Sequence, residues 1–175
     1  RYVITGGSGA DTITTGGGID TIVSGGGVDT ITAGGGNDII TLGTGVQTIK
    51  AGTVAANGTD SITSFVSGTD ILDLDVFMDG ITKVFEAIAT DGADITTDAN
   101  VIVIGGAGTI ASAATAIAAD ATVTGTDGII VIDNGTDSSV YHTTDLGANG
   151  TETLLFTLAG VGAAEALVTG DFIFA

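Results

Sequence analysis

Residues 6 to 50 read GGSGADTIT TGGGIDTIV SGGGVDTIT AGGGNDIIT LGTGVQTIK, which are five nine-residue units without a break. Glycine fills slots two and four of every unit, and isoleucine fills slot eight. Slot six holds an aspartate in four units and then a glutamine: Asp11, Asp20, Asp29, Asp38 and Gln47. A period this strict indicates a solenoid, in which each unit adds one step to a stack.

Three residue types have distinct structural roles within a unit. Glycine reaches positive φ without steric cost, so the first six residues can curl and aim carbonyls at one point. Aspartate supplies hard oxygen ligands of the kind that Ca²⁺ accepts. Alternating β-branched residues such as Thr12-Ile13-Thr14 predict a short strand with one side chain inward. A flexible glycine-rich linker is the alternative, but a linker needs no isoleucine in every inward slot.

Each unit is therefore predicted to be a turn plus a strand, with two units closing one flattened coil, so that turn n stacks on turn n+2. Cations would lie between the turns of Asp11 and Asp29 and between those of Asp20 and Asp38. A third site, between the turns of Asp29 and Gln47, should be weaker because an amide replaces a carboxylate. The candidate metal-binding residues lie in slots one, three and six of four units and in a degenerate sixth unit: Gly6, Ser8, Asp11, Thr15, Gly17, Asp20, Ser24, Gly26, Asp29, Ala33, Gly35, Asp38 and Asp60.

The units resemble the GGxGxDxUx nonapeptide of RTX proteins, where U is a large aliphatic residue. The resemblance covers residues 6 to about 75, and it implies a parallel β-roll with several Ca²⁺ ions between its turns. Two departures are that slot one is glycine only at Gly6 and that Gln47 replaces the fifth aspartate. Tyr2 falls in slot six of an incomplete unit, so we expect the chain to be a fragment of a longer protein.

The chain is strongly acidic, with 21 acidic and 3 basic residues in 175 and a formal charge of −18. A solenoid of aspartates repels itself, so folding is expected to require bound cations. Three scattered cations cannot form a basic patch, which excludes nucleic acid as a partner. No apolar run approaches the roughly 18 residues of a membrane span, and no N-terminal signal peptide is visible.

Cysteine is absent, and a secreted protein stabilised by metal needs no disulfides. Extracellular calcium modules bind at about 10⁻⁴ to 10⁻³ M. Such sites would be empty in a bacterial cytoplasm and filled outside the cell. We therefore expect a secreted or cell-surface protein that folds on emergence.

The strict register ends at Lys50. Residues 51–63 hold a sixth unit with a four-residue insertion, in which Asp60 and Ile62 restore slots six and eight. Residues 64–74 are expected to cap the open end of the roll with large apolar side chains, and they are similar to the segment that follows the repeats in serralysin-type proteases. The predicted capping side chains are Phe65, Ile71, Leu72 and Leu74. The first domain is thus assigned to residues 1–75.

Residues 76–175 contain less glycine and more alanine, and we predict a small, mostly antiparallel α+β domain. A helix is expected over residues 109–120. The sequence Asp133-Asn134-Gly135 is a strong hairpin signal. Strands are predicted at residues 101–104, 129–132, 138–143, 154–158 and 172–174.

The chain ends in Asp171-Phe172-Ile173-Phe174-Ala175, an acidic residue followed by apolar ones. This resembles the uncleaved C-terminal signal that type I (ABC-transporter) secretion systems read. An ordinary apolar terminal strand is the alternative. The resemblance implies an ABC transporter as a partner during export.

Catalytic chemistry is not expected. His142 is the only histidine and is interpreted as an ordinary strand residue, with no HExxH or Ser–His–Asp set around it. Residues 145–150 lack the glutamate of an EF-hand at slot twelve and are interpreted as a polar hairpin loop. The glycines precede aspartate rather than lysine, which excludes a phosphate loop. The remaining acidic residues are interpreted as a solvated face, with peripheral calcium ligation as the alternative: Asp70, Asp73, Asp75, Asp91 and Asp94.

The sequence thus favours a non-enzymatic structural module most like the RTX-bearing S-layer proteins of Gram-negative bacteria. Its expected partners are calcium and other copies of itself in a lattice. Alanine, threonine, valine, glycine and aspartate dominate the composition, with almost no lysine. The alternatives are the secretion and folding module of an RTX metalloprotease or lipase, and the terminal region of a giant adhesin.

Overall fold

The computed structural model describes residues 1–78, 85–88, 101–104, 128–144, 152–161 and 167–174. The predicted helix at 109–120, the loop at 145–150 and both Asp91 and Asp94 lie outside these residues. Among the described residues, no helix is long and apolar enough to cross a membrane.

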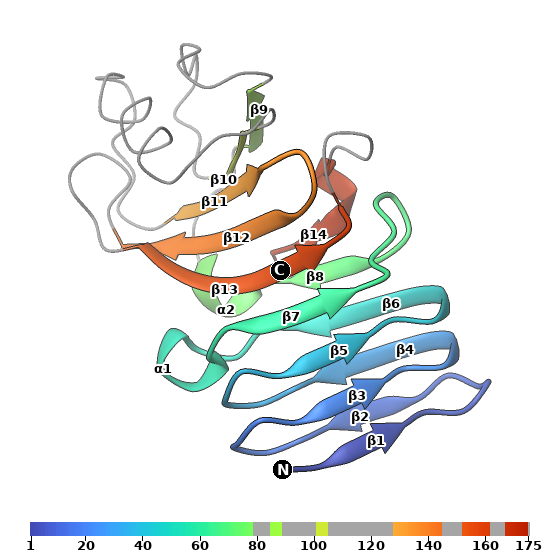
Figure 1. Cartoon of the computed structure of the whole chain (residues 1–175). Helices are drawn as coiled ribbons and strands as arrows, with labels where there is room; N and C mark the ends of the chain where they lie inside the picture. Colours follow the sequence, from blue (N-terminus) through green and yellow to red (C-terminus); the bar gives the residue numbers. More distant parts are fainter. Residues whose placement is uncertain (79–84, 89–100, 105–127, 145–151, 162–166, 175) are drawn as a thin grey trace.

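The repeat folds as a flattened coil in which consecutive strands alternate between two facing sheets (Figure 1). All strand pairs within this roll are parallel, which confirms the predicted β-roll. Its strands are β1 (Val3–Thr5), β2 (Thr12–Thr14), β3 (Thr21–Val23), β4 (Gly26–Thr32), β5 (Ile39–Thr41), β6 (Thr44–Lys50), β7 (Asp60–Thr63) and β8 (Ile71–Asp73).

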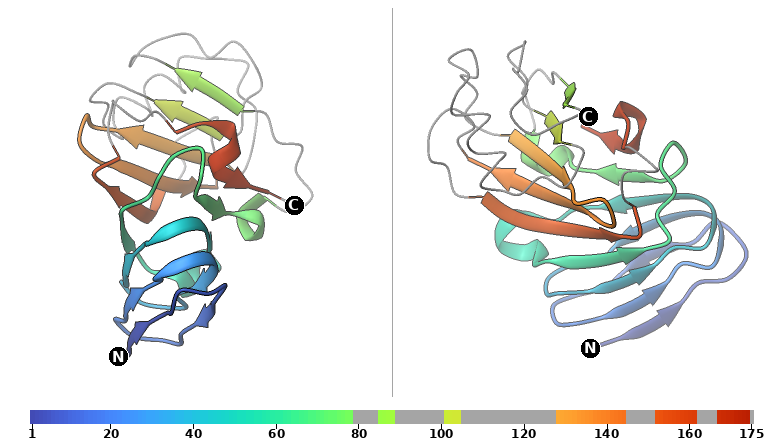
Figure 2. Two further views of the ribbon diagram at one scale, coloured as in Figure 1. Left: turned by 90° about the vertical axis from the view of Figure 1, so that its right-hand side faces the viewer. Right: turned by 45° about the horizontal axis from the view of Figure 1, so that its top comes forward.

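The pairing register confirms that each turn stacks on the second turn along the chain. Thr12 of β2 lies beside Thr30 of β4, and Val3 of β1 lies beside Thr21 of β3. Two nine-residue units therefore make one coil, and Figure 2 shows the coils as a narrow stack. Because a strand separation is about 4.8 Å, each slot forms a column with that spacing along the roll.

The slot-eight side chains form two buried columns that fill the roll. Each fully buried isoleucine contributes on the order of 1.5–3 kcal/mol relative to an exposed one, and most members here are 0–1% exposed. One column contains Ile4, Ile22, Ile40, Ile62 and Leu158, and the other contains Ile13, Ile31, Ile49, Leu72 and Phe172.

The glycines of the turns permit this close stacking. At Gly27, φ is +124°, and a Cβ atom would collide with the carbonyl of Gly9 in the turn beneath. At Gly43, a Cβ atom would overlap the carbonyl of Gly25. Backbone therefore packs on backbone at the turns, and a side chain in either slot would separate the coils.

The four-residue insertion of the sixth unit leaves the strand register intact. It forms the short helix α1 (Val54–Asn57), which projects from the turn between β6 and β7 (Figure 1). After it, Ser61 resumes the column of Ile39, so β7 pairs with β5 as an ordinary coil.

The second half of the chain extends both sheets of the roll. Its described elements are α2 (Asp75–Met78), β9 (Phe85–Ile88), β10 (Val101–Ile104), β11 (Gly128–Asp133), β12 (Ser138–Thr143), β13 (Glu152–Ala159), η1 (Thr169–Asp171) and β14 (Phe172–Ile173). Strands β9, β10 and β11 pair in parallel, whereas β11, β12 and β13 pair antiparallel. The β11–β12 hairpin turns at Asn134 and Gly135 as predicted, with φ of +87° at Gly135.

Two strands of this second half cover the end of the roll. Strand β13 pairs with β7 and β14 pairs with β8, giving a nine-stranded and a five-stranded sheet. Leu72 and Leu74 are fully buried and Phe65 is 3% exposed, as expected of a cap. However, residues 64–74 are not the outermost layer. Their strand β8 continues the sheet of β6, and β14 and β13 then cover β8 and β7.

Candidate metal-binding turns

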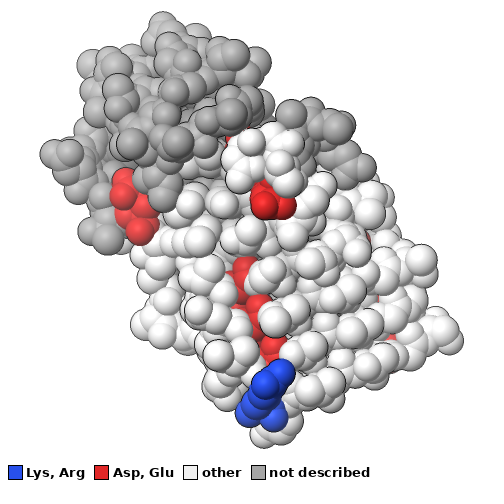
Figure 3. Space-filling view, viewed as in Figure 1, with Lys and Arg blue, Asp and Glu red and all other residues white. Residues whose placement is uncertain are grey.

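The slot-six residues form two ladders, one along each edge of the roll. We call the edge with the turns of Asp20, Asp38 and Asp60 edge A. Edge B carries Asp11, Asp29, Gln47 and Asp70. All of these side chains except Asp11 are at most 1% exposed. Figure 3 shows acidic side chains in a line along the roll, visible only in a narrow seam between white residues.

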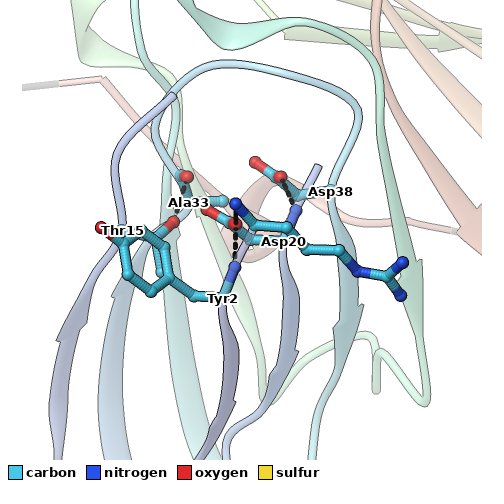
Figure 4. A network of polar contacts seen from close by, with 6 residues as sticks. Tyr2, Thr15, Asp20, Ala33 and Asp38 are labelled. Carbon is cyan, nitrogen blue, oxygen red and sulfur yellow. Dashed lines mark hydrogen bonds and ion pairs between the residues drawn. The ribbon is translucent and has the colours of Figure 1, made fainter. Parts of the chain in front are cut away.

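In every ladder carboxylate except Asp11, Oδ1 accepts a hydrogen bond from the backbone of the preceding coil. Oδ1 of Asp20 accepts from the N–H of Tyr2 at 2.6 Å, and Oδ1 of Asp38 accepts from the N–H of Asp20 at 2.7 Å. In the same way, Oδ1 of Asp60 accepts from the N–H of Asp38 at 3.0 Å. On edge B, Oδ1 of Asp29 accepts from the N–H of Asp11 at 3.0 Å. Figure 4 shows Asp20 and Asp38 pointing in the same direction from successive turns. The predicted pairs are thus brought together.

The second oxygen separates the ladder into two groups. In Asp11 it accepts from the N–H of Gly7 at 2.7 Å, in Asp60 from the amide of Asn57 at 3.2 Å, and in Asp70 from the N–H of Val66 at 2.8 Å. In the other three carboxylates Oδ2 is buried without a hydrogen-bond partner: Asp20, Asp29 and Asp38. A buried charged oxygen left unpaired costs about 1–3 kcal/mol or more. A cation beside these three oxygens would offset that cost.

Burial and the repulsion of neighbouring carboxylates raise the pKa of three ladder residues, Asp38, Asp60 and Asp70. Loss of solvation raises the pKa of Asp60 to about 7, and the neighbouring charge of Asp38 adds to the shift. Loss of solvation also raises the pKa of Asp38 and of Asp70, with further contributions from Asp20 and Asp171 respectively. The cation-free ladder therefore holds protons that the unfolded chain releases.

Acidification should stabilise the roll in calcium-free buffer. A raised native pKa gives a contribution that is complete below the unfolded value of 3.8 and is lost as pH rises through about 7. We expect circular dichroism in metal-stripped buffer to show more strand at pH 5 than at pH 8. A signal that falls or stays constant on acidification would contradict this protonation linkage.

The slot-one and slot-three residues lie in the stacked turns, but several of their carbonyls already accept hydrogen bonds. The Thr15 hydroxyl donates to the carbonyl of Ala33 (Figure 4), and the N–H of Gly18 donates to the carbonyl of Gly35 at 2.6 Å. Gly17 forms a parallel bridge with Gly35. These edge A carbonyls could serve a cation only through their second lone pair.

On edge B the corresponding turns are equally tight. The hydroxyl of Ser24 accepts from the N–H of Gly43 at 2.9 Å, and a Cβ on Gly6 would meet the carbonyl of Ser24. The N–H of Gly26 donates to the carbonyl of Gly7 at 2.9 Å, in a turn that stacks on the one containing Ser8. The candidate residues of each edge therefore lie in adjacent turns, as the sequence predicts.

The glutamine of the fifth unit brings an amide to the position where the other units have a carboxylate. Nε2 of Gln47 lies 3.4 Å from the carbonyl of Gly27, to which it donates. Its Oε1 is buried without a partner, like Oδ2 of Asp29 one coil below. The Asp29 and Gln47 side chains together carry one negative charge instead of two. A cation between them would therefore be held more weakly, as the sequence predicts for the third site.

Asn57 and Asp70 belong to the ladder although the sequence did not single them out for it. Asn57 ends α1, accepts from the N–H of Gly52 at 2.8 Å and donates to Asp60. Asp70 was interpreted as part of a solvated face, which is wrong: it is 1% exposed. It accepts from the N–H groups of Gln47 and Val66 at 2.9 and 2.8 Å, so it satisfies the turn above Gln47 without a metal.

Asp73 and His142 have ordinary structural environments. Asp73 forms an ion pair with Lys50 at 2.8 Å, and this contact raises the pKa of Lys50. His142 on β12 is 6% exposed and its ring centroid lies 5.0 Å from that of Phe77. Within the described part of the chain, no three His, Cys, Asp or Glu side chains converge on one point. The inter-turn positions instead combine pairs of carboxylates with backbone carbonyls.

Comparison of the chain with models of known families and with curated proteins gives no match.

Proposed function

We propose that this chain is a calcium-binding structural module of a secreted bacterial surface protein, of the RTX type and most like S-layer proteins. The observation that supports this best is the set of three buried carboxylates with an unpartnered oxygen: Asp20, Asp29 and Asp38. They recur at the same slot of stacked turns, where a cation would offset both the repulsion and the lost solvation.

The donor set favours calcium over other metals. Carboxylate and carbonyl oxygens suit Ca²⁺, Mg²⁺ or Mn²⁺, whereas zinc, copper and iron sites use imidazole or thiolate ligands. The chain has no cysteine, and its one histidine, His142, lies on β12 rather than in a turn. Irregular arrangements of seven or eight oxygens fit the larger and more tolerant Ca²⁺ better than the octahedral Mg²⁺.

The residues that would hold the ions follow from the two edges. On edge A, Asp20 and Asp38 would share one ion, with the turn carbonyls of Thr15 and Ala33 beside them. On edge B, Asp29 would act with Asp11 and, more weakly, with Gln47. When bound, calcium would neutralise charge and cross-link successive coils, and the stacked turns of the chain would orient the oxygens.

The surface-protein role rests on composition and on the proposed export route. A chain with 21 acidic and 3 basic residues repels itself, so cation-dependent folding separates an unfolded state inside the cell from a folded state outside. In this proposal the chain has no enzymatic activity, leaves the cell through a type I transporter and meets further copies of itself in a surface lattice.

Substitution of Asp38 tests the metal role because its effect should change sign with calcium. Asp38→Asn keeps the oxygen that accepts from Asp20 but removes the unpartnered charge. We expect the variant to be more stable than the wild type in EGTA and less stable in millimolar calcium, by about 1–3 kcal/mol in each direction. Urea denaturation in calcium measures the loss, and the strand signal that remains in EGTA by circular dichroism measures the gain.

Asp73→Asn is the matched control, since Asp73 lies outside the two ladders and pairs with Lys50 at 2.8 Å. Its calcium-dependent stabilisation should stay close to that of the wild type. Equal calcium dependence in Asp38→Asn and the wild type would refute the metal role of edge A.

A further inference from the structure

The last residues of the chain form part of the roll rather than a free tail. Strand β14 pairs in parallel with β8, so that Phe172 lies beside Leu72 in the inner apolar column. Phe172 is 7% exposed, and the ring of Phe174 stacks on it at a centroid distance of 6.2 Å. The tail therefore supplies the top layer of one of the two columns that fill the roll, and Figure 1 shows β14 beside β8.

Asp171 attaches this layer to the last turn of the roll. Its side chain is 0% exposed. Oδ1 accepts from the N–H of Gly68 at 2.6 Å, while Oδ2 accepts from the Ser67 hydroxyl at 2.8 Å and from the N–H of Val168 at 2.7 Å. Hydrogen bonds to a charged group are the strong ones in proteins. The bonds of Asp171 to Ser67 and Gly68 join residues more than 100 positions apart in the sequence.

The donors that hold Asp171 are in place only when the last coil has formed. Ser67 and Gly68 lie in the turn that Asp70 closes, through its bonds to the N–H groups of Gln47 and Val66. Without that turn, a buried carboxylate at position 171 would lose two of its three donors, and burying it would be unfavourable. Docking of the tail and closure of the roll are thus coupled through one carboxylate.

We propose that the tail, Asp171–Phe174, is the closing layer of the roll. Folding of the roll would then bury the segment that resembles an export signal. The segment would be accessible in the unfolded chain and buried in the folded one. A folded molecule could then no longer be recognised through this segment. This inference rests on the proposed function in that it takes calcium as the trigger of folding.

Digestion of the full chain with carboxypeptidase Y, followed by mass spectrometry, tests the proposal. In EGTA we expect the enzyme to remove residues past Asp171. In millimolar calcium we expect digestion to stop before Phe172. A tail that is trimmed equally fast in both conditions, while circular dichroism reports a calcium-folded roll, overturns the inference but leaves the proposed function intact.

Two variants and a control locate the effect. Asp171→Asn removes the charge, so we expect the tail to be digested about tenfold faster or more in calcium and the calcium midpoint of folding to rise. Ser67→Ala removes one donor and should speed digestion of the tail in calcium by a smaller factor, roughly threefold. This second variant tests the role of the Asp171 contacts if Asp171→Asn does not fold. Glu152→Gln, the same charge change on β13, should match the wild type.

The remaining outcomes are also distinct. Wild-type digestion rates in both Asp171→Asn and Ser67→Ala would overturn the role of the carboxylate. Protection of the tail that persists in EGTA, together with an unchanged dichroism spectrum, would refute calcium-triggered folding and with it the proposed function.

Discussion

Removal of calcium with EGTA at pH 8 should unfold the roll, with loss of the strand signal in far-ultraviolet circular dichroism. Stacked carboxylates lie about one strand separation apart. At an effective dielectric constant of 20, two such charges repel by about 3 kcal/mol. Three pairs are adjacent in the ladders: Asp11 with Asp29, Asp20 with Asp38, and Asp38 with Asp60. The summed repulsion approaches the 5–15 kcal/mol by which a whole domain is stable.

Hydrogen exchange read by mass spectrometry should localise this unfolding to residues 1–75 and to the tail that docks on them, Asp171–Phe174. Electron microscopy of the same samples tests assembly, with arrays in calcium and none in EGTA. Magnesium at equal concentration should restore little, because it demands a compact octahedral shell and gives up its waters reluctantly. A dichroism spectrum that does not change on chelation would contradict the proposed role of calcium.

The substitution Gly27→Ala should prevent the roll from stacking even in saturating calcium. Alanine at φ of +124° carries backbone strain on the order of 1–3 kcal/mol. Its Cβ would also collide with the carbonyl of Gly9 and force the two turns apart. Separated turns would disrupt the carboxylate pair of Asp11 and Asp29. We expect a total loss of about 4 kcal/mol or more, measured by urea denaturation in calcium.

Gly9→Ala is the matched control, because Gly9 fills the same slot in the first unit. Nothing lies within 4 Å of a Cβ built on Gly9, and its φ is not positive. The change should therefore shift stability by less than about 1 kcal/mol. Equal effects of the two substitutions would show that stacking of the turns is not what requires glycine.

The sequence predicted the roll well because its period is rigid. Nine-residue spacing alone implied that Asp11 lies below Asp29, and the backbone bond between them confirms it. Local turn chemistry also sufficed for the hairpin at Asp133-Asn134-Gly135. In both cases the information lies within a few residues or repeats at a fixed interval.

Prediction failed where an interval changed or where contacts were distant. Asp70 follows Asp60 by ten residues instead of nine, so the period does not mark it as a ladder residue. The pairing of β13 with β7 joins Phe156 to Asp60 across the second half of the chain. No local pattern specifies such a partner, because the pairing depends on which sheet edges remain open after the roll has formed.

The alternation of units between two edges makes the chain sensitive to parity. Removing nine residues would move every later aspartate to the opposite edge and every later strand to the opposite sheet. Removing eighteen would shorten the roll by one whole coil and leave the order of both edges unchanged. Helix α1 (Val54–Asn57) escapes this constraint because its four residues project from a turn. Repeats of this kind should therefore lengthen and shorten in pairs, as duplications of two units at once.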